Sequence, residues 1–313
     1  MKLKKLSLFL LSLCLFSCNQ GTSSSTNNVP SVINIIAPQG TPSLGLANFY
    51  SDKTNYDTFD IKAGADALVA AFTSNDYDII VAPTNLGAKL YNSNKKFVLY
   101  NTIVWGNLYL ATTNSDINSF EDLNNKNVTL FGKNSTPDIV MKSLIKYYNI
   151  NVELNYVDDV NTANAMLKTN KNVDIIVSAE PSISKIGSTI NNLKVIDLQT
   201  EFSKISNKGS YPQASIFVRN EKKNELKNTL IKMKQSILDT KNIEQTADNA
   251  LLMHESFSTL GKETLIKAIP NCHFGIEENQ KDAIENYFNK MNELGLGAQF
   301  GEKLPDEEFY FNF

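Results

Sequence analysis

Few side chains in this chain of 313 residues have the type and spacing that chemistry requires. The most suggestive are Cys272 and His273, adjacent residues that could ligate a metal ion or perform nucleophilic catalysis. A structural zinc site needs four ligands and a catalytic site usually three, yet the other histidine, His254, stands alone and no second Cys or His cluster exists. We therefore expect these residues to be packed or exposed, and we predict no metal site.

Other catalytic signatures are equally scarce. The sequence has no P-loop, no dinucleotide-binding fingerprint and no Gly-x-Ser-x-Gly elbow. Asp158 and Asp159 are neighbouring carboxylates, but adjacent side chains on a strand or turn diverge, so we expect a solvated loop. The sequence thus predicts no catalytic residue and no cofactor.

Hydroxyl and amide side chains are instead concentrated in four short turns. Each turn follows an apolar run of strand length and precedes a helical pattern; the four stretches begin at Ile35, Ile79, Val128 and Ile175. A helix N-terminus at the carboxyl end of a parallel strand presents unpaired N–H groups and partial positive charge, which suit a small polar ligand. Four such turns without catalytic residues indicate binding rather than catalysis.

The elements that hold these turns alternate between strand and helix, which predicts an α/β fold. Expected strands include residues 78–82, 97–100, 128–131, 152–157, 173–177 and 214–218. Thr136 as N-cap, followed by Pro137 and Asp138, predicts the start of one helix, and the C-terminal third is helical. At this length and with 42% hydrophobic residues, the chain is expected to fold as two lobes.

The N-terminus is predicted to be a lipoprotein signal peptide, residues 1–17. Three lysines precede an apolar run, residues 6–16, that is too short for an ordinary membrane span. The run ends in a box that resembles a bacterial lipoprotein cleavage site, although Phe16 is bulkier than usual, and Cys18 is the expected lipidation site. A plain secretory signal is the alternative. Residues 18–31, rich in Ser, Thr and Asn, are expected to be a flexible tether.

The cysteine and charge content narrow the possible classes of protein further. Cys14 leaves with the signal and Cys18 carries lipid, so Cys272 is left without an intrachain disulfide partner. The leader holds three of the 30 basic residues and none of the 33 acidic ones, so the mature chain has a formal charge of 27 − 33 = −6. This acidic balance argues against binding to nucleic acid.

Several short motifs, in this order, are typical of one family. They are residues 36–42 (IAPQGTP), residues 122–126 (DLNNK), residues 135–138 (STPD), residues 172–175 (NVDI) ending in Glu180-Pro181, and Tyr211-Pro212. Together they resemble the periplasmic-binding-protein type II fold, in the branch that binds nitrate, sulfonates, taurine and thiamine precursors. Asn125 stands where the family usually has glycine, and asparagine tolerates the left-handed geometry of that turn.

The resemblance implies two lobes, each a mixed sheet flanked by helices, joined by two crossing strands that act as a hinge. We expect residues 32–112 and 207–313 in lobe 1 and residues 113–206 in lobe 2, with crossings near 108–112 and 214–218. A small molecule would be held in the cleft between the lobes and handed to the permease of an ABC importer. The resemblance also implies an exported monomer, lipid-anchored to the bacterial cell membrane on its outer face or in the periplasm.

In that fold the strand-to-helix turns line the cleft, which selects the expected ligand-binding residues. These are Gln39, Thr41, Pro42, Ser43, Thr84 and Asn85 from the first lobe, Asn134, Ser135, Thr136 and Glu180 from the second, and Trp105 and Tyr211 near the hinge. Hydroxyl, amide and N–H groups fix polar atoms, and an aromatic ring supplies contact area. The alternative for each hydroxyl is an ordinary helix cap, and for Trp105 it is core packing.

The charged residues favour some ligands over others. Glu180 could meet a cationic or N–H-bearing group of the ligand, or form a salt bridge at the surface. Arg219 is the sole arginine and we expect it to be solvated, so an amino-acid ligand clamped by arginine is disfavoured. An oxyanion such as a sulfonate could bind at helix N-termini. A neutral or weakly basic heterocycle, such as a thiamine-related pyrimidine, fits the acidic balance somewhat better.

Two other functions stay open. One is an enzyme on the same fold resembling the thiamine-pyrimidine synthases, which need an active-site histidine; the leader and the histidine positions argue against it. The other is a surface-interaction lipoprotein that has kept the fold without a role in transport.

Overall fold

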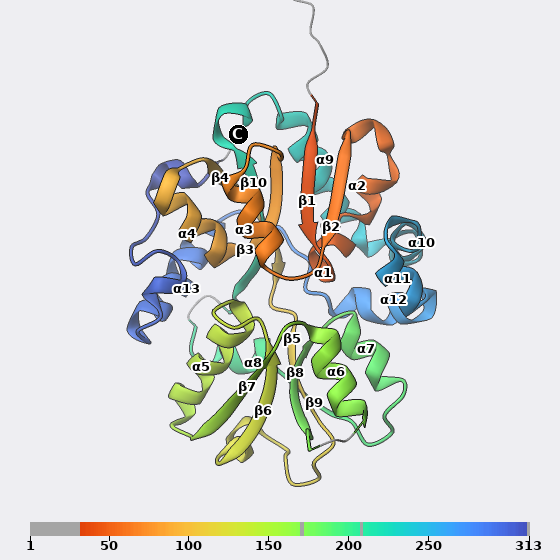
Figure 1. Ribbon diagram of the computed structural model, residues 1–313, viewed down its shortest axis with the longest axis vertical. Helices are drawn as coiled ribbons and strands as arrows, with labels where there is room; N and C mark the ends of the chain where they lie inside the picture. Colours follow the sequence, from red (N-terminus) through yellow and green to blue (C-terminus); the bar gives the residue numbers. More distant parts are fainter. Residues whose placement is uncertain (1–31, 170–171, 207–208, 312–313) are drawn as a thin grey trace, which may run out of the picture. The chain divides into compact units, whose positions relative to one another are not determined.

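Two five-stranded sheets form the frame of this chain (Figure 1). The computed structural model describes residues 32–169, 172–206 and 209–311, so the expected signal peptide, Cys18 and the tether lie outside the described residues. No helix in these ranges is both long and apolar enough to span a bilayer.

The first sheet has the strand order β2-β1-β3-β10-β4 and the second the order β7-β6-β8-β5-β9. The strands of the first sheet are β1 (Asn34–Pro38), β2 (Thr58–Lys62), β3 (Ile79–Pro83), β4 (Phe97–Trp105) and β10 (Pro212–Arg219). Those of the second are β5 (Leu108–Thr112), β6 (Lys126–Phe131), β7 (Val152–Val157), β8 (Ile175–Ala179) and β9 (Lys194–Asp197). Each sheet is mixed: β10 runs antiparallel to β3 and β4, and β5 runs antiparallel to β8 and β9.

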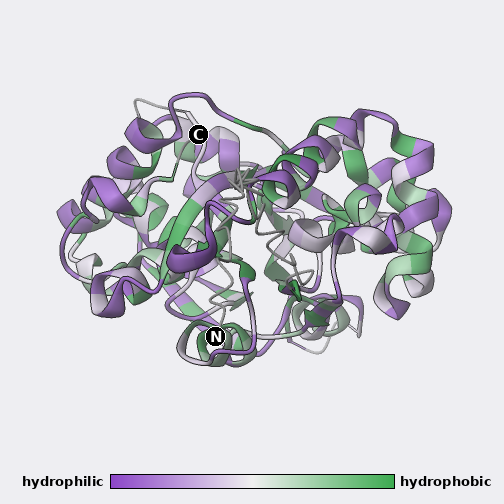
Figure 2. Cartoon of the chain, turned by 90° about the horizontal axis from the view of Figure 1, so that it is seen from above, coloured by the Kyte–Doolittle hydropathy of each residue, from purple (hydrophilic) through white to green (hydrophobic). Residues whose placement is uncertain are grey.

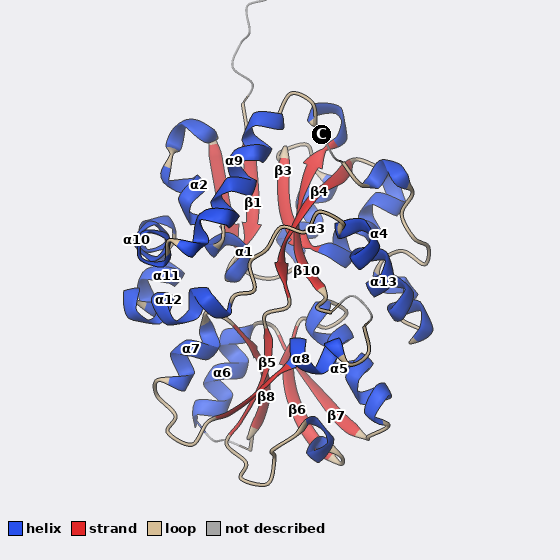
Figure 3. Cartoon of the chain, turned by 180° about the vertical axis from the view of Figure 1, so that it is seen from behind, coloured by secondary structure: helices blue, strands red, loops and turns tan. Residues whose placement is uncertain are grey.

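Helices flank both sheets (Figure 3), so the predicted α/β class with two mixed, helix-flanked sheets is confirmed. The α-helices up to β10 are α1 (Thr41–Leu44), α2 (Ala47–Ser51), α3 (Asp66–Thr73), α4 (Thr84–Asn94), α5 (Thr136–Tyr148), α6 (Val160–Thr169), α7 (Ser182–Gly187) and α8 (Leu198–Ser203). After β10 come α9 (Lys227–Leu238), α10 (Ile243–Met253), α11 (Glu255–Leu260), α12 (Lys262–Ala268) and α13 (Gln280–Glu293). Short 3-10 turns are η1 (Lys53–Asn55), η2 (Phe120–Leu123), η3 (Asn220–Lys222), η4 (Asp239–Lys241), η5 (Ile269–Asn271), η6 (Gly297–Gln299) and η7 (Glu307–Phe309).

Strands of both sheets are covered on both faces, which explains their apolar runs. Every residue of β4, β5 and β8 is buried. The outer helices carry both hydrophilic and hydrophobic residues along their length (Figure 2), as helices that pack one face on a sheet do. In α5, for example, Val140 and Leu144 are fully buried whereas Tyr147 is half exposed.

The four polar turns join strands to helices as the sequence predicts. They lead from β1 to α1, from β3 to α4, from β6 to α5 and from β8 to α7, so each sheet contributes two. α5 begins at Thr136 with Ser135 as its N-cap, one residue earlier than expected. Asn125 has a φ of 61°, the left-handed geometry expected where the family has glycine.

The strand at 108–112 was expected at the end of the first lobe, but it pairs with β8 and β9 in the second sheet. The chain leaves the first sheet earlier, at Gly106 and Asn107, which both have a positive φ, of 111° and 79°. It returns between α8 and β10, and β10 lies wholly in the first sheet. Both crossings therefore lie in the short links rather than in the strands we expected, because those strands are paired on both sides within their sheets.

Gln199 of α8 joins the two links. Its Oε1 accepts hydrogen bonds from the backbone N–H of Leu108 (2.7 Å) and the hydroxyl of Tyr211 (2.9 Å). The first link packs so closely on α8 and on the second link that a Cβ atom at Gly106 would lie 2.1 Å from Cγ of Gln199 and 2.9 Å from Oγ of Ser210. Glycine is thus needed at position 106 for both its φ and its lack of a side chain.

Candidate functional site

The turns after β1 and β8 meet where the two sheets adjoin. Thr41 Oγ1 donates a 2.6 Å hydrogen bond to the main-chain carbonyl of Glu180. Asn107 donates to Thr41 Oγ1 (2.8 Å) and accepts from the Glu180 N–H (3.1 Å). All three residues are buried. Asn107 was not among the expected residues, although a Gly-Asn pair between two apolar runs is a recognisable turn signal.

The turns after β3 and β6 are linked through a third segment. The side-chain N–H of Asn85 donates to the Gln299 carbonyl (3.0 Å), and the Gln299 side chain donates to Asn134 Oδ1 (3.4 Å). Gln299 ends η6, more than 160 residues beyond Asn134. A polar residue in a short C-terminal turn carries no local signal for this role, so the sequence could not identify it.

Three of the expected binding residues have buried polar atoms that find no hydrogen-bond partner within the described residues. They are Asn85 Oδ1, Trp105 Nε1 and Thr136 Oγ1, and the remaining atoms of this kind are Gln213 Oε1, Tyr287 OH and Tyr310 OH. A buried polar atom without a partner costs roughly 1–3 kcal/mol, so native proteins satisfy nearly all of them. Groups that the protein leaves unsatisfied are natural contacts for a ligand.

Five of these groups are connected to one another through shared neighbours. Gln213 follows Pro212, whose partner in the β-ladder is Trp105. The Tyr287 ring lies 6.5 Å from that of Tyr211, which precedes Pro212. We call Asn85, Trp105, Thr136, Gln213 and Tyr287 the unpartnered cluster.

Thr136 completes this chain of neighbours. Burial raises the pKa of the Tyr287 hydroxyl, and the Thr136 hydroxyl beside it lowers that pKa, although the two hydroxyls do not meet hydrogen-bond geometry. Asn85 joins the same region because Gln299 connects it to Asn134, two residues before Thr136. The cluster therefore draws on β4 and β10 of the first sheet, on α4, on α5, which follows β6 of the second sheet, and on α13.

No protein-family model and no curated protein sequence matches this chain. Solved structures do. An ABC transporter structure from Parabacteroides distasonis has a TM-score of 0.76 at 20% identity, covering 90% of this chain and 99% of that one. The periplasmic aliphatic sulphonate binding protein SsuA from Escherichia coli has a TM-score of 0.67 at 12% identity, covering 88% and 92%. A Candida albicans gene product described as having the generic periplasmic binding protein fold has a TM-score of 0.58 at 11% identity, covering 85% and 90%.

This chain has the periplasmic-binding-protein fold. The expected resemblance is confirmed at the level of the fold, which is what likeness at such low identity establishes. In this binding-protein fold the two sheets and the links between them are those described above.

The other expected binding residues fall into two groups. Gln39, Pro42 and Ser135 are half-buried, and Asn134 is exposed. The remaining hydroxyls are already engaged: Ser43 donates to the Gly40 carbonyl (3.0 Å), Thr84 pairs with Ser215 (2.7 Å), and Tyr211 donates to Gln199. These three residues thus use their hydroxyls to hold the binding-protein fold.

The side chain of Glu180 lies apart from the unpartnered cluster. Its carboxylate accepts hydrogen bonds from the Ser184 N–H (3.2 Å) and hydroxyl (2.8 Å), so it caps the first turn of α7. Burial raises the pKa of Glu180 to about 7, although Ser184 and Asn271 lower it. The carboxylate lines a separate cavity of about 420 Å³ that contains none of the other expected binding residues.

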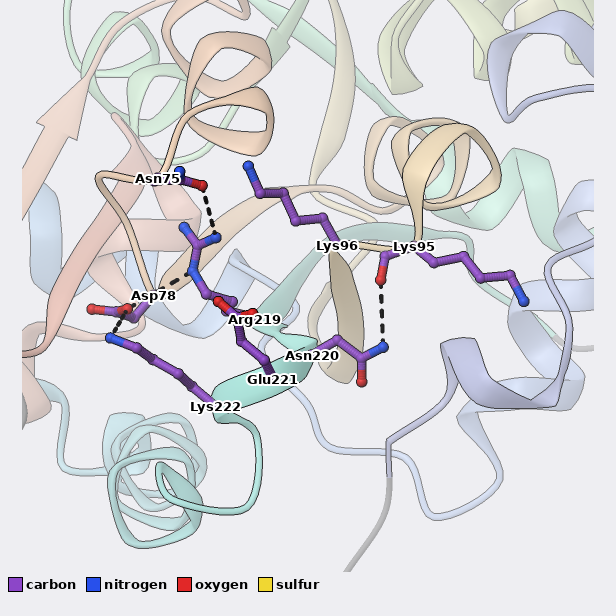
Figure 4. Close-up of a pocket in the computed structure, with 8 residues that line it drawn as sticks. All are labelled: Asn75, Asp78, Lys95, Lys96, Arg219, Asn220, Glu221 and Lys222. Atoms are coloured by element: carbon purple, nitrogen blue, oxygen red, sulfur yellow. Dashed lines mark hydrogen bonds and ion pairs between the residues drawn. The ribbon is translucent and has the colours of Figure 1, made fainter.

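A larger cavity of about 690 Å³ lies at the opposite end of the first sheet (Figure 4). This is the end of the sheet away from the polar turns. Asp78 lies just before β3 and Arg219 is the last residue of the antiparallel β10, whereas the polar turn comes after β3. Arg219 was expected to be solvated, but it is 4% exposed, packs on the Phe97 ring and donates to Asn75 and Tyr77. Lys222 pairs with Asp78 at 2.7 Å. These charges already bind one another, so the cavity is not the candidate site.

The Cys272 and His273 pair is structural. The Cys272 thiol is fully buried, donates to the Ala268 carbonyl (3.3 Å), and burial raises its pKa well above the usual range. The His273 ring bonds Gln199 (3.0 Å), and burial lowers its pKa. Within the described ranges no group of three or more Cys, His, Asp or Glu side chains is placed to hold a metal ion.

Proposed function

We propose that this chain is an extracytoplasmic solute-binding lipoprotein that delivers a small molecule to an ABC importer. The observation that carries the proposal is the unpartnered cluster: buried polar groups, on the first sheet and on helices that follow strands of both sheets, that find no partner among the described residues. The fold supports it, because the neighbours of this fold carry the names of transport components and binding proteins.

The chemistry of the cluster favours a neutral heterocycle that bears N–H groups. Asn85 uses its NH₂ group for the Gln299 carbonyl, which fixes the orientation of its amide and leaves Oδ1 as an acceptor. Gln213 Oε1 is an acceptor as well, whereas Trp105 Nε1 is a donor. An oxyanion can only accept and cannot satisfy two acceptors. A thiamine-precursor-like aminopyrimidine supplies both N–H donors and ring-nitrogen acceptors.

A sulfonate or related oxyanion is the second candidate. Several structural neighbours are named for sulfonate binding, and one is described as bound to the sulfonate buffer MOPS. The N-terminus of α5 could offer N–H groups to such a ligand. The cluster contains no Lys, Arg or His side chain, which places this candidate after the heterocycle.

Partners and location follow from the same proposal. The two sheets would be the cores of two lobes that close on the ligand, with the links at Gly106-Asn107 and between α8 and β10 as the hinge. A monomer anchored through Cys18 would sit outside the cytoplasmic membrane and meet the importer permease. An enzyme on this fold is disfavoured because His273 bonds Gln199 and His254 caps α11.

Calorimetric titration tests the proposal. The panel contains the aminopyrimidine precursor of thiamine, taurine, an alkanesulfonate and nitrate. We expect the aminopyrimidine to bind and Thr136→Val to weaken it about fivefold to tenfold, since one hydrogen bond to a buried hydroxyl is lost. Thr73→Val, which changes an exposed threonine on α3, is the matched control and should leave affinity unchanged.

Each outcome distinguishes between the candidate functions. Binding of the sulfonates alone would favour the second candidate. A folded protein that binds nothing in the panel, and that releases no small molecule for mass spectrometry after purification, would point to the surface-interaction lipoprotein instead. Turnover of a bound molecule would indicate an enzyme.

A further inference from the structure

The cavity that contains the Glu180 carboxylate is separate from the proposed ligand site. It has a volume of about 420 Å³, and no member of the unpartnered cluster lines it. Its walls come from β5, α7, β9 and the segment around η5. The lining residues are Tyr109, Glu180, Ile183, Ser184, Gly187, Leu193, Val195, Asp197, Pro270, Asn271 and His273.

Two carboxylates give the cavity its charge. Glu180 and Asp197 both line it, and no Lys or Arg side chain among the described residues does. Within the described ranges neither carboxylate forms an ion pair. Glu180 is 5% exposed and has only the neutral Ser184 and Asn271 as hydrogen-bonding neighbours. A buried carboxylate without a cation is costly, which makes this wall a place where a positive charge would be stabilised.

The histidine in the wall does not supply that positive charge. Gln199 Oε1 already accepts from Leu108 and Tyr211, so the Gln199 NH₂ group faces the ring and donates to His273 Nε2. Nε2 is therefore an acceptor, which requires a neutral ring protonated on Nδ1. Burial also lowers the pKa of His273. The cavity thus holds negative charge without a resident cation.

Apolar surface and an aromatic ring complete the cavity. Ile183, Leu193 and Val195 supply aliphatic wall. The Tyr109 ring is held in place because its hydroxyl donates to the Asn271 carbonyl (2.8 Å). Burial raises the pKa of the Tyr109 hydroxyl, and the Glu180 and Asp197 carboxylates raise it further; all three residues line the cavity. An ammonium group prefers such a mixture of carboxylate and aromatic surface.

We propose that this cavity binds a small alkylammonium ion, with its charged group toward Glu180 and Asp197 and its alkyl chain on the aliphatic wall. The apolar wall favours an organic cation over a hydrated metal ion, which would need a cluster of oxygen ligands. This site does not depend on the proposed function of the unpartnered cluster.

The test is calorimetric titration of the intact mature chain with n-butylammonium at about pH 8, above the Glu180 pKa of about 7. n-Butanol has a similar shape without the charge. We expect saturable binding of n-butylammonium and none of n-butanol. Glu180→Gln and Asp197→Asn should each weaken binding at least about tenfold, since each removes a charge-assisted contact.

Three further measurements make the result decisive. Glu153→Gln, at an exposed position of β7, should leave n-butylammonium binding unchanged. Thr136→Val should leave it unchanged too, which separates this cavity from the proposed ligand site. If thermal unfolding shows that Glu180→Gln does not fold, the affinity of Asp197→Asn alone decides the result. Absence of saturable binding to the folded chain, or equal affinity in the wild type and Asp197→Asn, would overturn the proposal.

Discussion

The Thr41 hydroxyl donates a 2.6 Å hydrogen bond to the main-chain carbonyl of Glu180, which lies 139 residues further along the chain. One residue begins α1 beside the first sheet, and the other follows β8 of the second. Because Asn107 bonds both partners and sits in the link between the sheets, a single hydroxyl helps to set how the two turns face each other.

Removal of this hydroxyl should destabilise the fold. Thr41→Val keeps the shape of the side chain but removes the 2.6 Å bond to the buried Glu180 carbonyl and the acceptor of the Asn107 N–H, which leaves only the long 3.5 Å contact between Asn107 and that carbonyl. We expect the free energy of unfolding to fall by about 1–3 kcal/mol, measured by urea denaturation. Thr73→Val on the surface of α3 should change it by less than about 0.5 kcal/mol. Equal stability of the wild type and Thr41→Val would show that the hydrogen bond is not important.

Gly106→Ala should be costly for two separable reasons. Gly106 has a φ of 111°, which alanine adopts poorly, and the new Cβ would lie 2.1 Å from the Gln199 side chain. Gly64 also has a positive φ, of 79°, but a Cβ there meets nothing within 4 Å. Gly64→Ala should therefore cost about 1 kcal/mol from backbone strain alone, and Gly106→Ala about 2–4 kcal/mol from strain and overlap. Similar losses for both variants in urea denaturation would contradict the close packing of the two links.

Local pattern was sufficient to predict the polar turns and most of the strands, but not β2 or β9. The continuous apolar runs at β3 and β8 identify buried strands, and the Ser-Thr-Pro-Asp motif identifies the start of α5 to within one residue. The pairing of the strands was harder to predict, because the apolar sequence of a strand such as β5 is compatible with a position in either sheet. Only its partners, β8 and β9, decide its place.

Contacts between distant segments could not be predicted. In the sequence, Tyr287 does not differ from other tyrosines on an amphipathic helix, and Gln299 is one polar residue of a short turn. Arg219 lies in a charged stretch, which suggested exposure, yet it packs on Phe97 of β4 and lies 3.9 Å from Asp78, which precedes β3. In each case the deciding partner is far away in sequence, so periodicity and local composition carry no information about it.

The stability of the fold should depend on pH through Glu180. Its folded-state pKa of about 7 is higher than the ordinary value of 4.5, so the folded chain binds more protons between these two values. Stability should consequently fall as pH rises from about 4.5 to 7, by roughly 2–3 kcal/mol at most. The groups around the carboxylate are Ser184, Asn271, Tyr109 and Asp197, together with the buried Cys272 thiol.

Urea denaturation of the wild type and Glu180→Gln at a series of pH values measures this effect. The difference between their unfolding free energies should grow as pH rises, with Glu180→Gln gaining relative stability. His273 contributes the opposite slope, because burial lowers its pKa, but it is present in both proteins and cancels in the difference. A difference that stays constant from pH 4.5 to 7 would mean that the carboxylate titrates as an exposed group does.

Trp105, the single tryptophan, should report ligand binding at the unpartnered cluster. Its buried indole N–H has no hydrogen-bond partner among the described residues, and an acceptor on the bound ligand would form a hydrogen bond that shifts the emission spectrum. We expect titration with the aminopyrimidine to change the fluorescence with the same Kd as calorimetry. Trp105→Phe should weaken that Kd about fivefold to tenfold while the thermal midpoint changes little, since the ring is replaced by another aromatic ring and only the N–H is lost.

n-Butylammonium, which we assign to the separate cavity beside Glu180, should bind Trp105→Phe as tightly as the wild type. Ligand binding by calorimetry without any change in emission would place the ligand away from Trp105.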